Sequence, residues 1–144
     1  MANKSIGFIG GGRITRIFLE ANKRDGISNQ NIVVSDVNND ILTALNQDYP
    51  GIEISLNDNT KPAGCDVVFL AIHPPMIGAI LADITPKLQP NAIFVSLAPK
   101  FTIPKLTQTL AGFNRVARMI PNAPSIVGAG YNPIAFGPGL KDEI

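Results

Sequence analysis

The sequence predicts an α/β protein of one domain, built on a doubly wound and mostly parallel sheet. Short runs rich in β-branched residues alternate with helical patterns along the chain. The connections between them are short, which favours right-handed crossovers between parallel strands. The length of 144 residues and the hydrophobic share of 45% fit a single globular domain with a large apolar core.

The strands of this sheet are expected at apolar or alternating runs. Val67–Ile72 and Ile93–Leu97 are almost wholly apolar, as expected of strands that are covered on both faces. The short run Ile52–Ile54 would complete the first half of the sheet, and Tyr131–Phe136 is the last candidate. The remaining expected strands are Ser5–Ile9, Ile32–Ser35 and Val116–Ile120.

Four helices are expected between the strands. Asn38 or Asn39 would cap the second helix, and Thr102 precedes the fourth, in which Pro104 is tolerated in the first turn. The expected ranges are Ile14–Lys23, Ile41–Asp48, Met76–Leu88 and Ile103–Leu110.

The regular pattern weakens after residue 120. Pro121–Gly130 contains two prolines and two glycines and is expected to be a loop. We divide the chain into one domain over residues 1–137 and a segment over 138–144. This segment is expected to begin a connection to a further part of the protein.

A glycine-rich turn, IGFIGGGRIT over residues 6–15, follows the first strand and opens the first helix. This context is typical of a Rossmann-type dinucleotide site. Gly10 permits the tight turn, and Gly12 lacks the Cβ that would block a pyrophosphate. Backbone N–H groups and the positive end of the helix would then face the anion. Thr15 stands where a small residue is expected, and Arg13 is expected to contact a phosphate or adenine, or else to be solvated.

Asp36 ends the second strand, about 20 residues after the turn, where a carboxylate accepts hydrogen bonds from the ribose hydroxyls of a dinucleotide. This carboxylate favours NAD over NADP because it repels a 2′-phosphate, and neither Val37 nor Asn38 brings an arginine. The alternative is that Asp36 only caps the next helix.

Composition argues against several other functions. The net charge is +1 without a basic stripe, so nucleic acid is not an expected partner. The single cysteine, Cys65, is expected to be buried packing rather than a reactive thiol. The sequence contains no metal-ligand cluster, no paired carboxylates, no signal-peptide pattern and no apolar run long enough for a membrane span. A cytoplasmic protein is therefore expected.

Five blocks resemble, in order, the N-terminal domain of pyrroline-5-carboxylate reductases: IGFIGGGRITR, VSDVNND, CDVVFLAIHPP, VSLAPKFTIPKL and RVARMIPNAPSIVGAG. The wider group includes the deazaflavin-dependent NADP oxidoreductases. The resemblance implies that pyrophosphate binds at Gly10, Gly11, Gly12, Arg13 and Ile14. It also implies that Ala71, His73 and Pro74 line the adenosine side, and that Ala98 and Asn122 approach the nicotinamide.

The resemblance further implies hydride transfer from NAD(P)H to a cyclic imine in proline biosynthesis. A second, helical domain would form a homodimer and supply much of the pocket for the imine or carbonyl substrate, so little turnover is expected of this chain alone. The alternatives are a non-catalytic dinucleotide-binding module and the cofactor domain of another NADP-dependent reductase. No residue is assigned as catalytic.

For three polar residues the sequence allows more than one interpretation. His73 is expected to contact the nucleotide or solvent, with an acid–base role as the alternative. Lys100 is expected to be solvated, or to pair with a substrate carboxylate or a phosphate. Asn122 would hydrogen-bond the nicotinamide amide or the substrate, or only form a turn.

Overall fold

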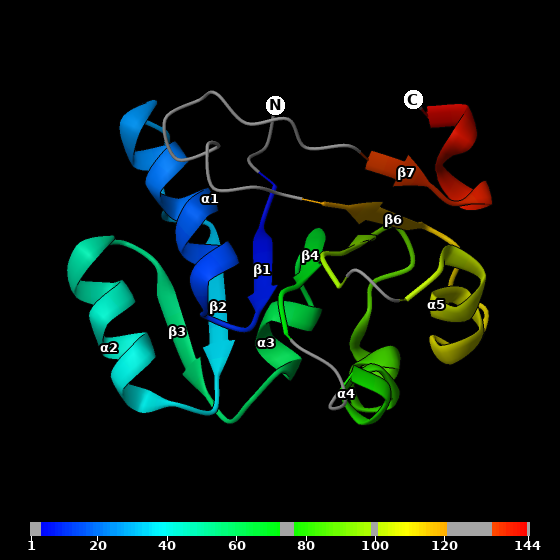
Figure 1. The fold of residues 1–144 in the computed structure, drawn as a ribbon, viewed down its shortest axis with the longest axis horizontal. Helices are drawn as coiled ribbons and strands as arrows, with labels where there is room; N and C mark the ends of the chain where they lie inside the picture. Colours follow the sequence, from blue (N-terminus) through cyan, green and yellow to red (C-terminus); the bar gives the residue numbers. More distant parts are fainter. Residues whose placement is uncertain (1–3, 73–76, 99–100, 121–133, 144) are drawn as a thin grey trace.

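The computed structural model describes residues 4–72, 77–98, 101–120 and 134–143. Its centre is a seven-stranded sheet in the order β3-β2-β1-β4-β5-β6-β7 (Figure 1). β1 to β6 are parallel, and β7 runs antiparallel to β6. Because the chain winds outward from β1 in both directions, the predicted doubly wound α/β fold is confirmed. The strands are β1 Ile6–Ile9, β2 Ile32–Asp36, β3 Glu53–Leu56, β4 Val67–Leu70, β5 Ile93–Ser96, β6 Val116–Met119 and β7 Ile134–Phe136.

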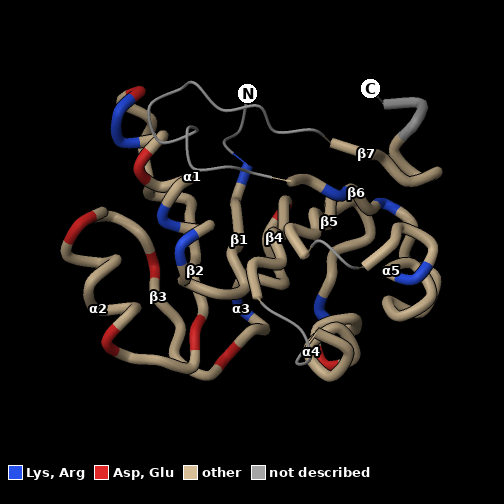
Figure 2. The backbone as a smooth tube through the Cα atoms, in the orientation of Figure 1, with Lys and Arg blue, Asp and Glu red and all other residues tan. Residues whose placement is uncertain are grey.

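Helices cover both faces of this sheet. Side chains of α1 and α2 pack on the face that includes Phe8, whereas those of α3, α4 and α5 pack on the face that includes Ile9. The helices are α1 Arg13–Arg24, α2 Asn39–Asp48, α3 Thr60–Ala63, α4 Ile77–Ile84 and α5 Ile103–Thr109, with 3-10 turns at Thr85–Lys87 and Pro138–Glu143. The charged residues of α1 are mostly basic, whereas those of α2 are acidic (Figure 2).

Three aromatic rings fix α1 on the middle of the sheet. Phe8 of β1 stacks on Phe69 of β4 with ring centroids 5.0 Å apart, and Phe18 of α1 lies 5.3 Å from Phe69. Offset or tilted pairs at this separation are favourable beyond the area that they bury. The start of α1 is therefore held above the carboxyl ends of β1 and β4, where the strand order reverses.

Most element boundaries agree with the sequence prediction within one or two residues. α4 is shorter than expected because Pro86 has no N–H to continue the helix, and a 3-10 turn follows. β3 extends to Leu56 rather than ending at Ile54, and the short helix α3 was not predicted. Cys65 is buried as expected, and burial raises the pKa of its thiol.

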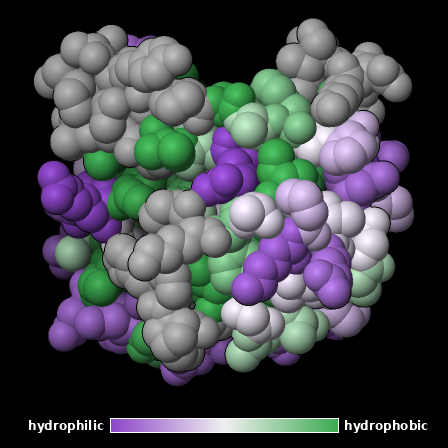
Figure 3. All heavy atoms as spheres, turned by 45° about the vertical axis from the view of Figure 1, so that its right-hand side comes forward, coloured by the Kyte–Doolittle hydropathy of each residue, from purple (hydrophilic) through white to green (hydrophobic). Residues whose placement is uncertain are grey.

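The C-terminal part of the sheet has exposed apolar side chains. Ile120, Ile134 and Phe136, at β6 and β7, are all more than a third exposed. Figure 3, which brings this side of the molecule forward, shows hydrophobic surface in its upper middle part and a more polar surface at the right. Leu140, by contrast, is 1% exposed and packs with Val95. The expected loop over residues 121–130 and the first part of the expected last strand lie outside the described residues. Among the residues described, no helix combines the length and the apolar character that a membrane crossing requires.

Candidate functional site

The three consecutive glycines between β1 and α1 have three different environments. Gly10 has φ +107°, and a Cβ on it would overlap the carbonyl oxygen of Ala71 at the end of β4. A Cβ on Gly11 would lie 3.0 Å from the side chain of Leu45 in α2. Among the described residues, nothing lies within 4 Å of such a Cβ on Gly12. Gly10 is thus required by the fold, and Gly11 packs tightly on α2, whereas Gly12 has no close neighbour among the described residues.

Thr15 fills the position where the sequence motif expects a small residue. It is completely buried, and its hydroxyl donates a hydrogen bond of 2.6 Å to the carbonyl oxygen of Gly10. A buried hydroxyl is costly unless it is paired, and here the turn itself supplies the acceptor. Thr15 therefore fits this position and also ties the first turn of α1 to the glycine turn.

Asp36 connects the glycine turn to the loop before α2. One carboxylate oxygen accepts the N–H of Gly11 at 2.8 Å, and the other accepts the N–H of Asn38 at 2.9 Å. The alternative that Asp36 caps the next helix is wrong, because the cap of α2 is Asn38. Its side-chain oxygen accepts from the N–H groups of Asp40 and Ile41 at 2.9 and 3.3 Å.

The start of α1 differs from the starts of α2 and α5. Asn38, one of the two predicted candidates, caps α2 through its side-chain oxygen, and Thr102, which directly precedes the expected fourth helix, caps α5. Within the described residues no side chain caps α1, and no acidic residue occurs in its first turn, which begins at Arg13. Uncapped N–H groups at the positive end of a helix favour an anion.

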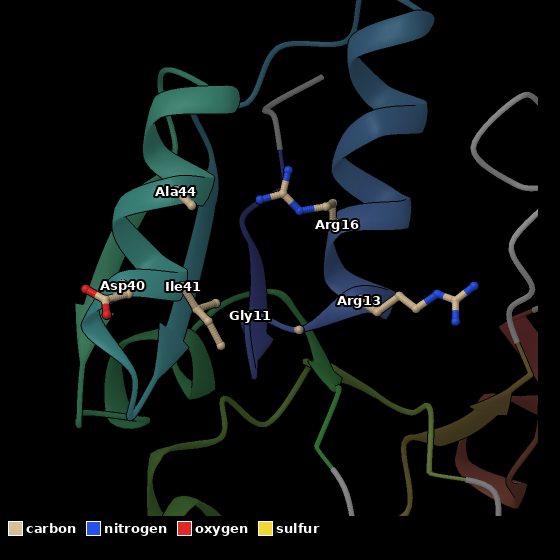
Figure 4. A pocket seen from close by; sticks show the side chains of 7 residues that line it. Gly11, Arg13, Arg16, Asp40, Ile41 and Ala44 are labelled. Atoms are coloured by element: carbon tan, nitrogen blue, oxygen red, sulfur yellow. The ribbon is translucent and has the colours of Figure 1, made fainter.

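A pocket of about 390 Å³ lies between the starts of α1 and α2, directly beside the glycine turn (Figure 4). We call it the interhelix pocket. It is lined by Gly11, Gly12, Arg13, Arg16, Asp40, Ile41 and Ala44. Sequence reasoning missed Arg16, although its position three residues after Arg13 on the same helix could have indicated it.

The two arginines of the interhelix pocket point in different directions. In Figure 4 the side chain of Arg13 extends away from α2, whereas the guanidinium of Arg16 extends toward α2. Arg16 forms an ion pair of 2.7 Å with Asp48 and lies 5.5 Å above the ring of Tyr49. The hydrogen bond with Asp48 raises the pKa of Arg16, which is already a permanent cation.

The structure brings some of the other predicted site residues to the same edge of the sheet. Ala71 follows β4 and lies against Gly10. Ala98 follows β5 and is 3% exposed. Ile14 packs beside Leu97. The predictions for His73, Pro74, Lys100 and Asn122 concern positions outside the described residues.

The comparisons with known proteins agree with this geometry. A family model described as NADP oxidoreductase coenzyme F420-dependent matches residues 5–100, about two thirds of the chain. The chain belongs to this family. The region of the chain that matches the family model begins just before β1 and includes the glycine turn and the interhelix pocket.

The curated relatives of this NADP oxidoreductase family member include pyrroline-5-carboxylate reductases, as the resemblance implied. Pyrroline-5-carboxylate reductase 3 of Xenopus laevis is 32% identical over 87% of this chain and 45% of its own length. Pyrroline-5-carboxylate reductase 1 of Bacillus subtilis is 29% identical over 98% of this chain and 48% of its own length. The chain thus spans about half the length of the curated relatives that it matches.

Solved structures show the same fold. A pyrroline-5-carboxylate reductase from Coxiella burnetii superposes with a TM-score of 0.88 at 28% identity, covering 99% of this chain and 53% of that one. A Plasmodium falciparum pyrroline carboxylate reductase with NADP bound superposes with a TM-score of 0.80 at 21% identity, over 99% of this chain and 52% of that one.

Proposed function

We propose that this chain is the cofactor-binding half of a reductase that transfers a hydride from NAD(P)H to a cyclic imine such as pyrroline-5-carboxylate. The observation that carries the proposal is the start of α1. In the part of the chain that the structure describes, no side chain caps its N–H groups, and nothing fills the space beside Gly12 next to the interhelix pocket. A pyrophosphate fits this combination of free donors, positive helix end and missing Cβ.

The chain's own residues would divide the binding as follows. The backbone of residues 10–14 holds the pyrophosphate, and Asp36 accepts a hydrogen bond from the adenosine ribose with the lone pairs that Gly11 and Asn38 leave unused. Ala71, His73 and Pro74 line the adenosine side, and Ala98 and Asn122 approach the nicotinamide. The bound cofactor supplies the hydride. The protein contributes orientation and the exclusion of water.

We predict that the chain binds NAD at least as tightly as NADP, because Asp36 carries a negative charge at the ribose end. The variant Asp36→Ser removes that charge and should move the ratio of the two dissociation constants toward NADP. The ratio is measured by titrating both dinucleotides into each protein. Tighter binding of NADP to the unaltered chain would show that Asp36 is not the ribose ligand. The melting temperature of the variant reports separately on its lost bonds to Gly11 and Asn38.

The substrate proposal rests on the relatives, and it extends beyond the 144 residues. We propose a domain over residues 1–137 and a connection over 138–144 to a helical domain that dimerises and completes the substrate pocket, in a protein of the cytoplasm. The chain alone then lacks the acceptor side of the reaction. Positioning of the two reactants contributes roughly 7–11 kcal/mol to such reactions, so we expect little or no turnover by the 144 residues.

The test is an NAD(P)H-oxidation assay with pyrroline-5-carboxylate, run on the 144-residue chain and on a longer protein that includes it. Turnover by the longer protein and almost none by the chain is the expected result. Robust turnover by the chain alone would contradict the two-part arrangement. Cofactor binding without turnover by the longer protein would instead identify a non-catalytic module.

A further inference from the structure

The interhelix pocket raises the question of which group of a ligand it accommodates. It lies beside the glycine turn on the side of α2, close to the end of β2, where Asp36 is bonded to Gly11. NAD and NADP differ at this end of the molecule, because NADP carries a phosphate on the adenosine ribose. Such a phosphate adds about −1.5 to −2 charges and needs a cation within reach, since Asp36 repels it.

The loop after β2 does not supply that cation, because it continues with Val37 and Asn38. Arg16 can supply this cation from the wall of the interhelix pocket that α1 forms, facing α2. In Figure 4 its guanidinium extends from α1 toward α2 at about the level of Ala44, while the carboxylate of Asp40 points away from it.

The present partner of Arg16 is exchangeable. The side chains of Arg16 and Asp48 are 40% and 54% exposed, and ion pairs between exposed side chains contribute only about 0–1 kcal/mol. A phosphate offers more charge and can accept two parallel hydrogen bonds from one guanidinium. The ring of Tyr49, which is 2% exposed, gives the guanidinium a fixed surface to move along.

We propose that Arg16 is the residue that lets this chain accept a 2′-phosphorylated dinucleotide, by exchanging its ion pair with Asp48 for one with the phosphate. This inference rests on the proposed function. Asp36 and Arg16 then act in opposite directions. Asp36 favours the free ribose hydroxyl. Arg16 offsets the repulsion between Asp36 and a phosphate on that hydroxyl. The chain therefore binds both dinucleotides, and Arg16 sets how far apart their affinities are.

The test compares dissociation constants for NADP and NAD by calorimetry in three variants. Arg16→Met should weaken NADP binding about 10- to 100-fold and change NAD binding less than about 2-fold. Asp48→Asn releases Arg16 and should tighten NADP binding about 2- to 5-fold, with NAD unchanged. Arg24→Met is the matched control, because it removes a positive charge from the same helix at a residue paired with Asp25, outside the interhelix pocket. Neither affinity should change in it by more than about 2-fold.

An unchanged NADP-to-NAD ratio in Arg16→Met would overturn the inference and leave the proposed function standing. An equal loss for both dinucleotides would overturn it too, because Arg16 would then contact a part that they share. If neither dinucleotide binds the unaltered chain, both proposals are wrong. Should Arg16→Met fail to fold, Asp48→Asn decides alone, and no gain for NADP in that variant counts against the inference.

Discussion

At the scale of single residues, the glycine turn shows how one motif combines a structural and a binding requirement. Gly10 needs its positive φ and its missing side chain to pass Ala71, and a side chain on Gly11 would press on Leu45 of α2. Gly12 has neither requirement within the described structure. The sequence motif predicted the tight turn at Gly10 and the open position at Gly12. It did not predict the packing of Gly11, which depends on where Leu45 comes to lie.

Thr15 offers a test at this scale. We expect Thr15→Ala to lower the free energy of unfolding by about 1–2 kcal/mol, because it removes a buried hydrogen bond and a buried methyl group. The control Thr15→Val keeps the shape and removes only the hydroxyl, and we expect it to lose about 1 kcal/mol. Denaturant unfolding measures both values. If Thr15→Val were as stable as the unaltered chain, the bond to Gly10 would contribute nothing.

At the scale of elements, α1 and α2 meet through a buried tyrosine as well as through apolar packing. Tyr49 is 2% exposed, and its hydroxyl donates a hydrogen bond of 2.5 Å to Glu20 of α1. Arg16 and Lys23 of the same helix lie over its ring. Burial raises the pKa of Tyr49 to about 12, and the hydrogen bond to Glu20 adds to this increase.

Because of this raised pKa, the stability that Tyr49 gives to the contact between α1 and α2 depends on pH in the alkaline range. The pKa of tyrosine is about 10 in the unfolded chain. The protonated Tyr49 hydroxyl therefore makes its full contribution to the free energy of unfolding below pH 10, and this contribution is lost as the pH rises toward 12. We expect the unaltered chain to lose about 2–3 kcal/mol more than Tyr49→Phe across this range. Denaturant unfolding of both proteins at several pH values measures the difference. Parallel pH profiles would contradict the assigned role of Tyr49.

The order of the elements could be predicted from the sequence, but some of their limits could not. The apolar runs and the capping residues Asn38 and Thr102 marked the strands and the starts of two helices correctly. The sequence pattern of apolar residues continues to Leu88, but α4 ends at Ile84. Pro86 cannot donate a helical hydrogen bond, and a 3-10 turn forms there instead. Helix α3 has only four residues, which is too short for an amphipathic period to be recognised.

At the scale of the whole molecule, the sheet order brings the ends of β1, β2 and β4 together and so assembles the candidate site. The sequence predicted this convergence through the glycine turn and Asp36. It did not predict the interhelix pocket, because Arg16 and Ala44 become neighbours only when α1 and α2 pack side by side. Ile134 and Phe136 leave apolar side chains exposed on β7, the strand that precedes the C-terminal turn Pro138–Glu143.

The central claim is that a nicotinamide dinucleotide binds at the glycine turn, and one calorimetric comparison tests it. NAD and NADP are titrated into the 144-residue chain and into Gly12→Val, with Gly64→Ala as a control at the opposite edge of the sheet. Because no described residue lies within 4 Å of a Cβ at Gly12, the valine variant should melt like the unaltered chain. We predict binding to the unaltered chain and to the control, and loss of binding in Gly12→Val. The claim would be contradicted if a folded Gly12→Val bound as tightly as the unaltered chain, or if the unaltered chain showed no heat of binding at millimolar dinucleotide.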